Sequence, residues 1–402
     1  MSVVKLKPSA LSGSVTLPPS KSAAHRALIC KFLAGGGSVD GIIPSDDMKA
    51  TGNALNALRN GYDVIDCIES GSTLRFMIPV AAALGKNVSF VGSGKLPQRP
   101  IDEYLRLLPE HGVKCEYSGA LPLKISGQLK AGKYEVAGHI SSQYITGLLL
   151  ALPLLSGDSE IILTSPLQSK PYADMTLKVM SDYGVIAEET ENGYFIKGNQ
   201  LYKKRDYKVE GDWSQAAFFL VGGALSGDVT LKGLDMNSTQ GDKEIVNILK
   251  ALGADIEVKR SSLRVKRSVL KGAQINVSDI PDTVPALAVA AMYAKGETVI
   301  TGAERLRIKE SDRLESVITN LRKMGINAKE TPDGMLIEGG RAKGASLCGF
   351  NDHRIVMAFS IAALCADGES EISDAMSINK SYPDFFEDYN LLGGAADVIS
   401  DR

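Results

Sequence analysis

Six stretches of the chain are apolar at almost every position over the length of a helix. Each opens with a small polar or charged cluster and closes at a glycine, and they cover residues 21–37, 72–85, 141–157, 213–227, 283–296 and 353–368. A helix that is apolar on all faces is buried, so each stretch predicts a buried helix. From the second stretch onward they begin about every 70 residues, which predicts a repeated structural unit.

Shorter patterns complete the repeated unit. Alternating segments rich in β-branched residues follow the closing glycines and predict strands at 38–42, 87–91, 160–163, 228–231, 298–300 and 371–372. Amphipathic helices are predicted at 102–111, 175–183, 243–252 and 315–324, each ending at a glycine. Two further strands are predicted in each of 184–198 and 253–267, the first pair turning at Asn192-Gly193. The first copy is predicted to be shortened, running from Asp66 directly to Gly71.

Six units in 402 residues predict an α/β (α+β) protein with two similar domains, each built from three βαβαββ-type units. The charged segment 202–208 lies near the midpoint of the chain and marks the expected crossing between the halves. The opening strand, 3–17, has no unit of its own on the N-terminal side, and we expect it to complete the C-terminal half. The predicted domains are therefore 1–19 together with 210–402, and 20–209.

Composition and charge exclude several classes of function. A net charge of −2 lacks the basic footprint of a protein that binds nucleic acid. The five cysteines are scattered without a CxxC pair, which predicts reduced thiols and no zinc site. The longest apolar run, 145–155, is too short to cross a bilayer, and residues 1–13 lack an apolar signal core. We therefore expect a soluble, cytoplasmic and monomeric protein.

The segment PPSKSAAHRAL, residues 18–28, predicts a site for an anion. Ser20 can cap a helix there, which puts Lys21 and Ser22 at the positive end of the helix dipole. Arg26 follows one turn later on the same face as Ser22. Exposed backbone N–H groups and two cations together bind phosphate or carboxylate. The alternative interpretation is a capped surface helix with scattered charges.

Equivalent positions of the other units carry further polar clusters. If these clusters converge on a cleft between the domains, they gather Lys21, Arg26, Arg75, Arg99, Lys170, Lys309, Arg313, Arg354 and Lys380. So many cations in a nearly neutral protein predict small anionic ligands. A carboxylate among them, such as Asp282 or Glu310, stays ionised and can accept a proton from a hydroxyl group. The alternatives are a plain helix cap at Asp282 and a solvated charge run at 310–313.

Seven motifs carry a resemblance to a known family. They occur in order within residues 18–387 and read PSKSAAHRAL, GKLPQRPID, SSQYITGLLLALP, LQSKPYADMTL, RIKESDRL, NDHRIVMAFSIAAL and NKSYPDFFE. Together they resemble the 5-enolpyruvylshikimate-3-phosphate synthases. The resemblance implies two domains that close over the substrates, with the active site in the cleft between them. It also implies a reaction without metal or organic cofactor, in which the 5-hydroxyl of shikimate 3-phosphate attacks phosphoenolpyruvate and a tetrahedral intermediate then loses phosphate.

The resemblance also implies roles for the matching residues. Lys21, Asp282 and Glu310 form the catalytic set, in which Asp282 accepts the hydroxyl proton and Lys21 or Glu310 protonates the methylene carbon. The residues implied to bind shikimate 3-phosphate are Lys21, Ser22, Arg26, Ser141, Ser142, Gln143, Ser169, Asp282 and Lys309. Those implied to bind phosphoenolpyruvate are Lys21, Gly71, Arg99, Gln143, Arg313, Arg354 and Lys380. The implied partners are these two small molecules, with no nucleic acid and no membrane.

The chain departs from the family pattern at two places. Many members carry NAGTAMRP where residues 69–76 of this chain read ESGSTLRF, although Gly71 and Arg75 keep their places. In the family this loop approaches phosphoenolpyruvate, the substrate with which glyphosate competes. The second departure lies just before Arg307, where residues 304–306 read ERL and some members offer an asparagine to the substrate.

Two other functions stay open. The related UDP-N-acetylglucosamine enolpyruvyl transferases share the architecture, but they carry a cysteine in the loop before the Arg-Pro pair, and residues 92–95 of this chain contain none. The other alternative is a catalytically silent scaffold that binds phosphate. Lys21, Asp282 and Glu310 occur together and favour an enzyme, because binding alone does not require an acid–base set.

Overall fold

The computed structural model describes residues 2–400, and the chain divides into two compact units. Ser20–Val209 form one of them, called the inserted unit below. Met1–Pro19 and Glu210–Arg402 form the other, called the split unit because the inserted unit interrupts it in sequence. Each unit buries a hydrophobic core of its own.

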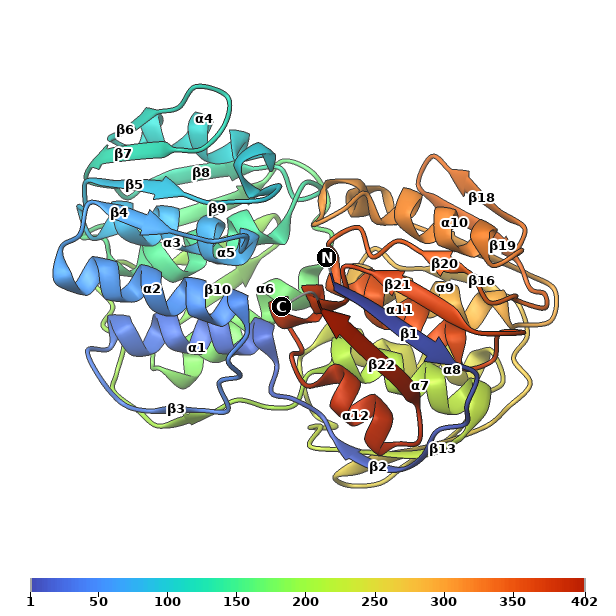
Figure 1. Cartoon of the computed structure of the whole chain (residues 1–402). Helices are drawn as coiled ribbons and strands as arrows, with labels where there is room; N and C mark the ends of the chain where they lie inside the picture. Colours follow the sequence, from blue (N-terminus) through green and yellow to red (C-terminus); the bar gives the residue numbers. More distant parts are fainter. Residues whose placement is uncertain (1, 401–402) are drawn as a thin grey trace. The chain divides into compact units, whose positions relative to one another are not determined.

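The inserted unit contains two four-stranded sheets of the same topology (Figure 1). In order across the sheet, the first consists of β4 (Val64–Asp66), β5 (Val88–Val91), β7 (Leu123–Gly127) and β6 (Val113–Glu116). The second consists of β8 (Lys133–Val136), β9 (Ser159–Leu163), β11 (Gly193–Ile196) and β10 (Ala187–Thr190). Each sheet joins a parallel pair to an antiparallel hairpin. The shortened copy consists of β3 (Val39–Asp40), paired in parallel with β12 (Tyr207–Lys208).

Apolar helices fill the interior of the inserted unit, as the apolar stretches predict. They are α1 (Lys21–Leu33), α3 (Gly71–Ala83) and α5 (Ser142–Ala151). All residues of α3 are buried except Ser72, because the helix is apolar on every face. The more polar helices α2 (Asp46–Asn60), α4 (Asp102–Glu110) and α6 (Lys170–Asp182) surround them, and 3-10 turns lie at η1 (Leu96–Gln98) and η2 (Leu152–Leu154).

The split unit repeats the same sheet three times. Its first sheet consists of β2 (Ser12–Thr16), β13 (Asp228–Lys232), β15 (Ser262–Lys266) and β14 (Asp255–Val258). The second consists of β16 (Gln274–Asn276), β17 (Glu297–Thr301), β19 (Gly334–Glu338) and β18 (Ala328–Thr331). The third consists of β20 (Ser346–Leu347), β21 (Ser370–Ser373), β1 (Ser2–Lys7) and β22 (Ala395–Ser400). Five four-stranded sheets and one two-stranded remnant therefore confirm the predicted sixfold repeat within residues 2–400.

The N-terminal strand closes the last repeat of the split unit. β1 lies between β21 and β22 (Figure 1). In the other four-stranded sheets, this position is occupied by the second strand of the antiparallel hairpin. Val4 pairs with Ile372 on one side and with Val398 on the other, and its side chain is fully buried. The first strand of the chain therefore completes a sheet whose other three strands come from the C-terminal part.

The helices of the split unit follow the same plan. The apolar ones are α7 (Trp213–Ser226), α9 (Val284–Met292) and α11 (His353–Ala363), which contact one another. The others are α8 (Ile245–Ala251), α10 (Arg313–Lys323) and α12 (Phe385–Leu391). 3-10 segments lie at η3 (Gly241–Glu244), η4 (Pro281–Thr283), η5 (Glu304–Ile308) and η6 (Ala375–Lys380).

Several predicted elements differ from the observed ones. The predicted strand at 3–17 is two strands in different sheets, because Pro8 and its neighbours leave the pleat between β1 and β2. α2 and α12 were not predicted, since their apolar stripes are short and interrupted by polar residues. The predicted turn at Asn192-Gly193 lies one residue earlier, with Gly193 opposite Thr190 as the first residue of β11. Between residues 2 and 400, no helix has both the length and the apolarity to cross a membrane.

Candidate active site

The first helix of the inserted unit presents Lys21 at its N-terminus. Ser20 caps α1 by accepting a hydrogen bond from the backbone N–H of Ala23 at 3.4 Å, as predicted. Lys21 is the first helical residue, and its Nζ lies 2.7 Å from Oδ2 of Asp47 in the first turn of α2. The two side chains keep 13% and 15% of their surface exposed, so a ligand can reach this ion pair.

The buried side chain of Arg26 connects three helices through hydrogen bonds. Its Nε donates to Oγ1 of Thr176 at 2.8 Å, and its Nη2 donates to Oγ1 of Thr146 and to the carbonyl of Tyr172. Its Nη1 donates to the carbonyl of Ser22 at 2.6 Å. Burial lowers the pKa of the guanidinium to about 10, so it stays charged at neutral pH. Arg26 thus holds α1 against α5 and α6 and supports the turn that carries Ser22.

The turn at Gly71 is shaped by the close approach of Arg99. Ser70 caps α3 with its hydroxyl oxygen, which leaves Gly71 as the first helical residue. A Cβ at Gly71 would lie 2.7 Å from Cζ of Arg99, so a larger residue would displace this buried guanidinium. The carboxyl group of Glu69 packs against Gly94, where a Cβ would lie 2.5 Å from its Cδ. The sequence departure at Glu69 therefore contacts the loop that leads to Arg99.

Arg75 positions Gln143 between two helix N-termini. Its Nη1 donates to Oε1 of Gln143 at 2.8 Å, and its Nη2 donates to the carbonyl of Pro100 at 2.7 Å. Nε2 of Gln143 in turn donates to Oγ of Ser72 at 3.1 Å, which joins the first turns of α5 and α3. Ser141 caps α5 by accepting from the backbone N–H of Gln143. The predicted residues of these two helices are thus held in one hydrogen-bonded group.

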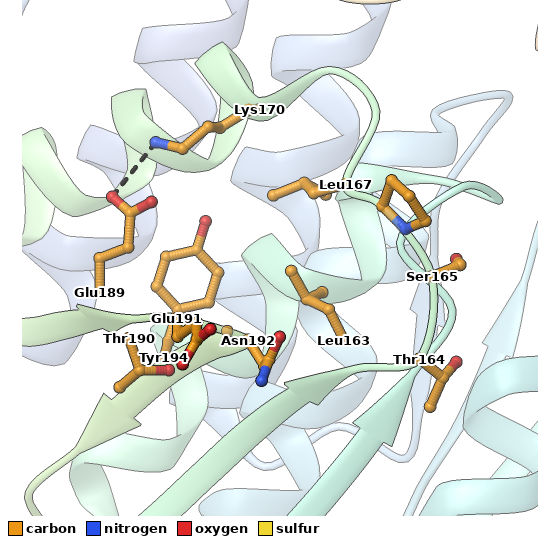
Figure 2. Close-up of a pocket in the computed structure, with 12 residues that line it drawn as sticks. Leu163, Thr164, Ser165, Leu167, Lys170, Glu189, Thr190, Glu191, Asn192 and Tyr194 are labelled. Carbon is orange, nitrogen blue, oxygen red and sulfur yellow. Dashed lines mark hydrogen bonds and ion pairs between the residues drawn. The ribbon is translucent and has the colours of Figure 1, made fainter.

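Two predicted serines and Lys170 complete this part of the inserted unit. Ser142, the first residue of α5, is buried, and Ser169 precedes α6 with a left-handed φ of 56°. Nζ of Lys170 lies 2.7 Å from Oδ1 of Asp174 and 3.2 Å from Oε2 of Glu189. Lys170 lines a cavity of about 500 Å³ next to the β10–β11 hairpin (Figure 2). Its ammonium is therefore held by two carboxylates, just as Lys21 is held by Asp47.

The split unit holds Asp282 inside a cluster of cations. Oδ2 of Asp282 accepts from Nη2 of Arg354 at 2.8 Å, and Oδ1 accepts from Nη1 of Arg313 at 3.0 Å. Nζ of Lys309 lies 3.9 Å from Oδ1. Burial opposes ionisation of Asp282, yet the charges of Arg354, Lys309 and Arg313 hold the pKa of its carboxyl well below the usual range. Asp282 is consequently a carboxylate at neutral pH.

Arg313 is the centre of this cluster and is 1% exposed. Its Nε donates to Oδ2 of Asp352 at 2.8 Å, and its Nη2 donates to Oε2 of Glu310 at 2.7 Å. Burial favours the neutral form of Arg313, but Asp352, Glu310 and Asp282 outweigh it and raise the pKa of its guanidinium. Ser311 donates a further hydrogen bond to Asp352. Three carboxylates thus converge on one permanently charged arginine.

Two lysines border the cluster in the split unit. Burial lowers the pKa of Lys309 to about 8, although the nearby Asp282 carboxylate opposes this shift. Nζ of Lys380, at the end of η6, donates to the carbonyl of Asn351 at 2.7 Å. Asn351 directly precedes the Asp352 cap of α11, so Lys380 lies at the helix start that carries Arg354.

The structure separates the alternatives for these acidic residues. Asp282 lies within η4, and the N-cap of α9 is Thr283, so the plain-cap interpretation does not describe Asp282. Asp312 does cap α10, accepting from the backbone N–H of Glu315 at 3.1 Å. Arg313, the next residue, is buried, so the segment 310–313 is not a solvated charge run as a whole.

Three functional partners were missed in the sequence. Asp47 pairs with Lys21 across 26 positions, and Asp352 pairs with Arg313 across 39. His25 begins a buried chain of hydrogen bonds described below. Ser45 followed by two aspartates is typical of a helix start near Asp47. A local pattern does not indicate which distant lysine pairs with such a carboxylate.

The two units offer complementary chemistry. The inserted unit presents serine-capped helix N-termini beside Lys21 and Arg99, a combination that binds phosphate or carboxylate oxygens. The split unit presents Asp282 as an ionised carboxylate together with Lys309 and Arg354. Such a carboxylate can take a proton from a hydroxyl group that is brought to it.

The sequence matches one protein family along most of its length. The family model described as EPSP synthase (3-phosphoshikimate 1-carboxyvinyltransferase) matches residues 6–63 and 59–389. A 3-phosphoshikimate 1-carboxyvinyltransferase of Clostridium novyi is 43% identical, and the alignment covers 100% of this chain and 99% of the relative. The enzyme of the same name from Clostridium kluyveri is 44% identical with the same coverage.

Solved structures agree with this match. The EPSP synthase of Acinetobacter baumannii superposes with a TM-score of 0.82 at 27% identity, covering 100% of both chains. The enolpyruvyl transferase NikO of Streptomyces tendae gives the same TM-score at 16% identity, covering 100% of this chain and 99% of NikO. The likeness to NikO concerns the fold alone, which is thus shared by proteins with very different sequences.

Proposed function

The chain belongs to the EPSP synthase family, and from this we propose that it is a 3-phosphoshikimate 1-carboxyvinyltransferase. It transfers the enolpyruvyl group of phosphoenolpyruvate to the 5-hydroxyl of shikimate 3-phosphate and releases inorganic phosphate. The observation that carries the proposal is the full-length identity of 43% and 44% to enzymes of that name. We place it in the cytoplasm as a monomer that acts on these small molecules without nucleic acid or membrane.

The inserted unit supplies most of the proposed shikimate 3-phosphate site. The phosphate of shikimate 3-phosphate accepts hydrogen bonds from hydroxyl and backbone N–H groups at the N-terminus of α5, where Ser141 and Ser142 lie. It also accepts one from Ser169, which precedes α6. Ser22 and Arg26 act at the start of α1, and Gln143 holds the sugar ring. Serine caps are neutral, so they leave the positive ends of the helix dipoles available to an anion. Lys309 adds a cation from the split unit.

Phosphoenolpyruvate is proposed to bind to Lys21, Gly71, Arg99, Gln143, Arg313, Arg354 and Lys380. Arginine binds carboxylate and phosphate through paired hydrogen bonds, which suits a substrate that carries both groups. The glycine at position 71 supports this assignment, because it lets the guanidinium of Arg99 lie against the backbone at the start of α3. Lys21 is assigned to both substrates.

Proton transfer accompanies each step of the proposed reaction. In the addition, the 5-hydroxyl oxygen bonds to C2 of phosphoenolpyruvate, its proton passes to Asp282, and C3 takes a proton from Lys21 or Glu310. In the elimination, C3 gives a proton back, the bond between C2 and the phosphate oxygen breaks, and the departing phosphate takes up the proton that Asp282 holds. The products are an enol ether and inorganic phosphate.

Asp282 needs help to act as a base. While Arg313 and Arg354 hold its carboxylate, its pKa is too low for efficient proton acceptance near neutral pH. Phosphoenolpyruvate is anionic and competes for the same two arginines. Its binding therefore loosens their hold on Asp282 and raises the pKa of the carboxyl toward a useful range. Asp282 becomes a competent base when the second substrate is present.

A comparison of acceptors tests the proposed function. The protein is incubated with phosphoenolpyruvate and either shikimate 3-phosphate or UDP-N-acetylglucosamine, and released phosphate and the enol ether are measured by proton and phosphorus NMR. We expect one phosphate for each enol ether formed, with shikimate 3-phosphate only. Turnover with the nucleotide sugar alone would identify the related transferase, and turnover with neither acceptor would identify a silent scaffold.

A further inference from the structure

A buried chain of hydrogen bonds runs through three helices of the inserted unit. Nδ1 of His25 on α1 lies 2.7 Å from Oγ1 of Thr51 on α2. Oγ1 of Thr51 lies 2.7 Å from Oγ1 of Thr73 on α3, which donates to Oγ of Ser70 at 2.9 Å. All four residues are at most 1% exposed. Buried hydroxyl groups are costly to leave unpaired, so these hydrogen bonds favour one arrangement of the four side chains.

The direction of one bond fixes the others. A hydroxyl group has one proton, and Thr73 gives its proton to Ser70. Thr73 must then accept from Thr51, and Thr51 must accept from Nδ1 of His25. Nδ1 of His25 therefore carries a proton. Nε2 of His25 is buried without a hydrogen-bond partner among the described residues, which agrees with a bare acceptor better than with a stranded N–H.

The electrostatic surroundings of His25 also favour the neutral ring. Burial lowers its pKa to about 3, with Asp47 opposing and Lys21 and Arg26 adding to the shift. The ring lies edge-on to Phe76 on α3, with 6.1 Å between the centroids. The imidazole of His25 thus remains an uncharged donor over the whole working range of pH.

The hydrogen-bonded chain lies directly behind the proposed active-site groups. Lys21 precedes His25 by four residues on α1, and Asp47 precedes Thr51 by four residues on α2. Residues four apart lie one above the other on a helix, so the His25–Thr51 pair is a second rung one turn below the Lys21–Asp47 ion pair. The far end of the chain is Ser70, which caps α3 next to Gly71.

We propose that His25, acting through Thr51 and Thr73, is a positioning residue that sets the Lys21–Asp47 pair relative to the glycine turn at Gly71. The inference rests on the proposed function, since there the turn is assigned to phosphoenolpyruvate and Lys21 to both substrates. A displacement of about 1 Å between reacting groups costs as much as a hundredfold in rate. Loss of the chain should therefore affect the use of phosphoenolpyruvate more than that of shikimate 3-phosphate.

Substitution of Thr51 tests the positioning role. We expect Thr51→Val to raise the KM for phosphoenolpyruvate about tenfold or more, with little change in the KM for shikimate 3-phosphate. Thr51→Ser keeps the hydroxyl group and should restore most of the activity. Thr298→Val is the matched control, because Thr298 is equally buried in β17 and its hydroxyl has no hydrogen-bond partner among the described residues. Equal effects of Thr51→Val and Thr298→Val on both KM values would overturn the proposal.

Substitution of His25 distinguishes its two nitrogens. His25→Asn can place an amide N–H donor close to the position of Nδ1, whereas His25→Gln places it near that of Nε2. His25→Leu removes both nitrogens and keeps an apolar side chain. We expect His25→Asn to retain a low KM for phosphoenolpyruvate, and His25→Gln and His25→Leu to raise it. A better rescue by glutamine than by asparagine would contradict the assigned direction of the chain.

NMR of the protein without substrates tests the proposed positioning role of His25 independently of enzymatic activity. Nitrogen-15 labelled histidine should show His25 as the neutral Nδ1–H form, assigned by its loss in His25→Asn. The amide resonances of Gly71 and Ser72 should shift in Thr51→Val and remain in place in Thr298→Val. An Nε2–H ring, or unshifted amides in Thr51→Val, would overturn the proposal, while an inactive wild-type protein with the expected spectra would refute only the proposed function.

Discussion

The two units use the same buried helices but begin them differently. In the inserted unit, α1, α3 and α5 are capped by Ser20, Ser70 and Ser141. In the split unit, α7 and α11 are capped by Asp212 and Asp352, and Asp282 stands just before α9. The cap position of α9 is Thr283, so carboxylates cap two of the three apolar helices of the split unit, whereas serines cap all three of the inserted unit.

This difference determines what each unit can bind. A carboxylate at a helix N-terminus already occupies the positive end of the dipole, so the helices of the split unit are poor sites for a further anion. Two of its carboxylates instead hold Arg313 and Arg354 in place. In the inserted unit, the first turns of α1, α3 and α5 contain no acidic residue. One repeat thus carries serine-capped helix starts, to which we assign the proposed anion site, in one unit and an array of oriented arginines and acids in the other.

The largest expected effect concerns the lysine at the start of α1. Lys21→Met should lower kcat by about a thousandfold, because general acid–base groups contribute 10²–10⁴ in rate. Lys170→Met is the matched control: Lys170 is also the first residue of a helix and also lies 2.7 Å from an aspartate. Steady-state kinetics of both variants should separate them, and similar activity in the two would remove Lys21 from its proposed role.

The second-largest effect on kcat is expected for Asp282 in the split unit. Asp282→Asn keeps the shape of the side chain and removes the charge that Arg313 and Arg354 hold, so we expect kcat to fall about a hundredfold or more. Asp228→Asn removes an equally well-formed arginine contact, with Arg264, from the surface of the same unit. Kinetics should show Asp228→Asn within about twofold of wild type, since exposed pairs contribute little. Full activity of Asp282→Asn would exclude Asp282 as the base.

A smaller effect is expected at the glycine turn of the inserted unit. The added methyl group of Gly71→Ala would lie 2.7 Å from Cζ of Arg99 and displace the guanidinium, so the KM for phosphoenolpyruvate should rise about tenfold. Gly52→Ala in α2 meets nothing within 4 Å and should instead stabilise the protein by about 0.5–1 kcal/mol. Initial rates and thermal melting measure the two effects. An unchanged KM in Gly71→Ala would show that Arg99 can move without consequence.

The smallest expected effect is a pH dependence of the KM for shikimate 3-phosphate, which we attribute to a lysine of the split unit. Lys309 has a pKa of about 8, so it carries a positive charge below that pH and loses it above. The KM for shikimate 3-phosphate should rise severalfold between about pH 7 and pH 9, because the phosphate then loses one cation. Lys309→Arg stays charged and should flatten this rise. A rise that persists in Lys309→Arg would assign the titration to another group.

Local patterns were sufficient to predict the repeat and its helix starts. Helix ends are determined by neighbouring residues, so they can be predicted from the local sequence. Examples are the glycines at the ends of α4, α6, α8 and α10 and the cap at Ser20. β1 and β2 were merged because their alternation continues across a short break at Pro8. α2 was missed because its buried face includes small and polar residues such as Ala50 and Thr51.

The contacts of the candidate site residues were not predictable from the sequence. Motifs singled out Arg26, Arg75 and Arg313 as cations, and the structure gives each of them protein oxygens as partners. Thr176 lies 150 positions from Arg26, and Asp352 lies 39 positions from Arg313. Such pairings depend on how the repeats pack, which no single segment encodes. The contact of His25 with Thr51 was not predictable for the same reason.

The contrast between neutral and acidic caps is tested most directly by calorimetric titration with shikimate 3-phosphate and with shikimate, which lacks the phosphate. The wild-type protein should bind the phosphorylated compound at least about a hundredfold more tightly. Ser141→Asp keeps a cap on α5 but gives it the charge found in the split unit, and should abolish this preference while shikimate affinity is unchanged. Ser118→Asp, which adds the same charge at an exposed bend, should retain the preference. An undiminished preference in Ser141→Asp would contradict the assignment of the anion site to the serine-capped helices.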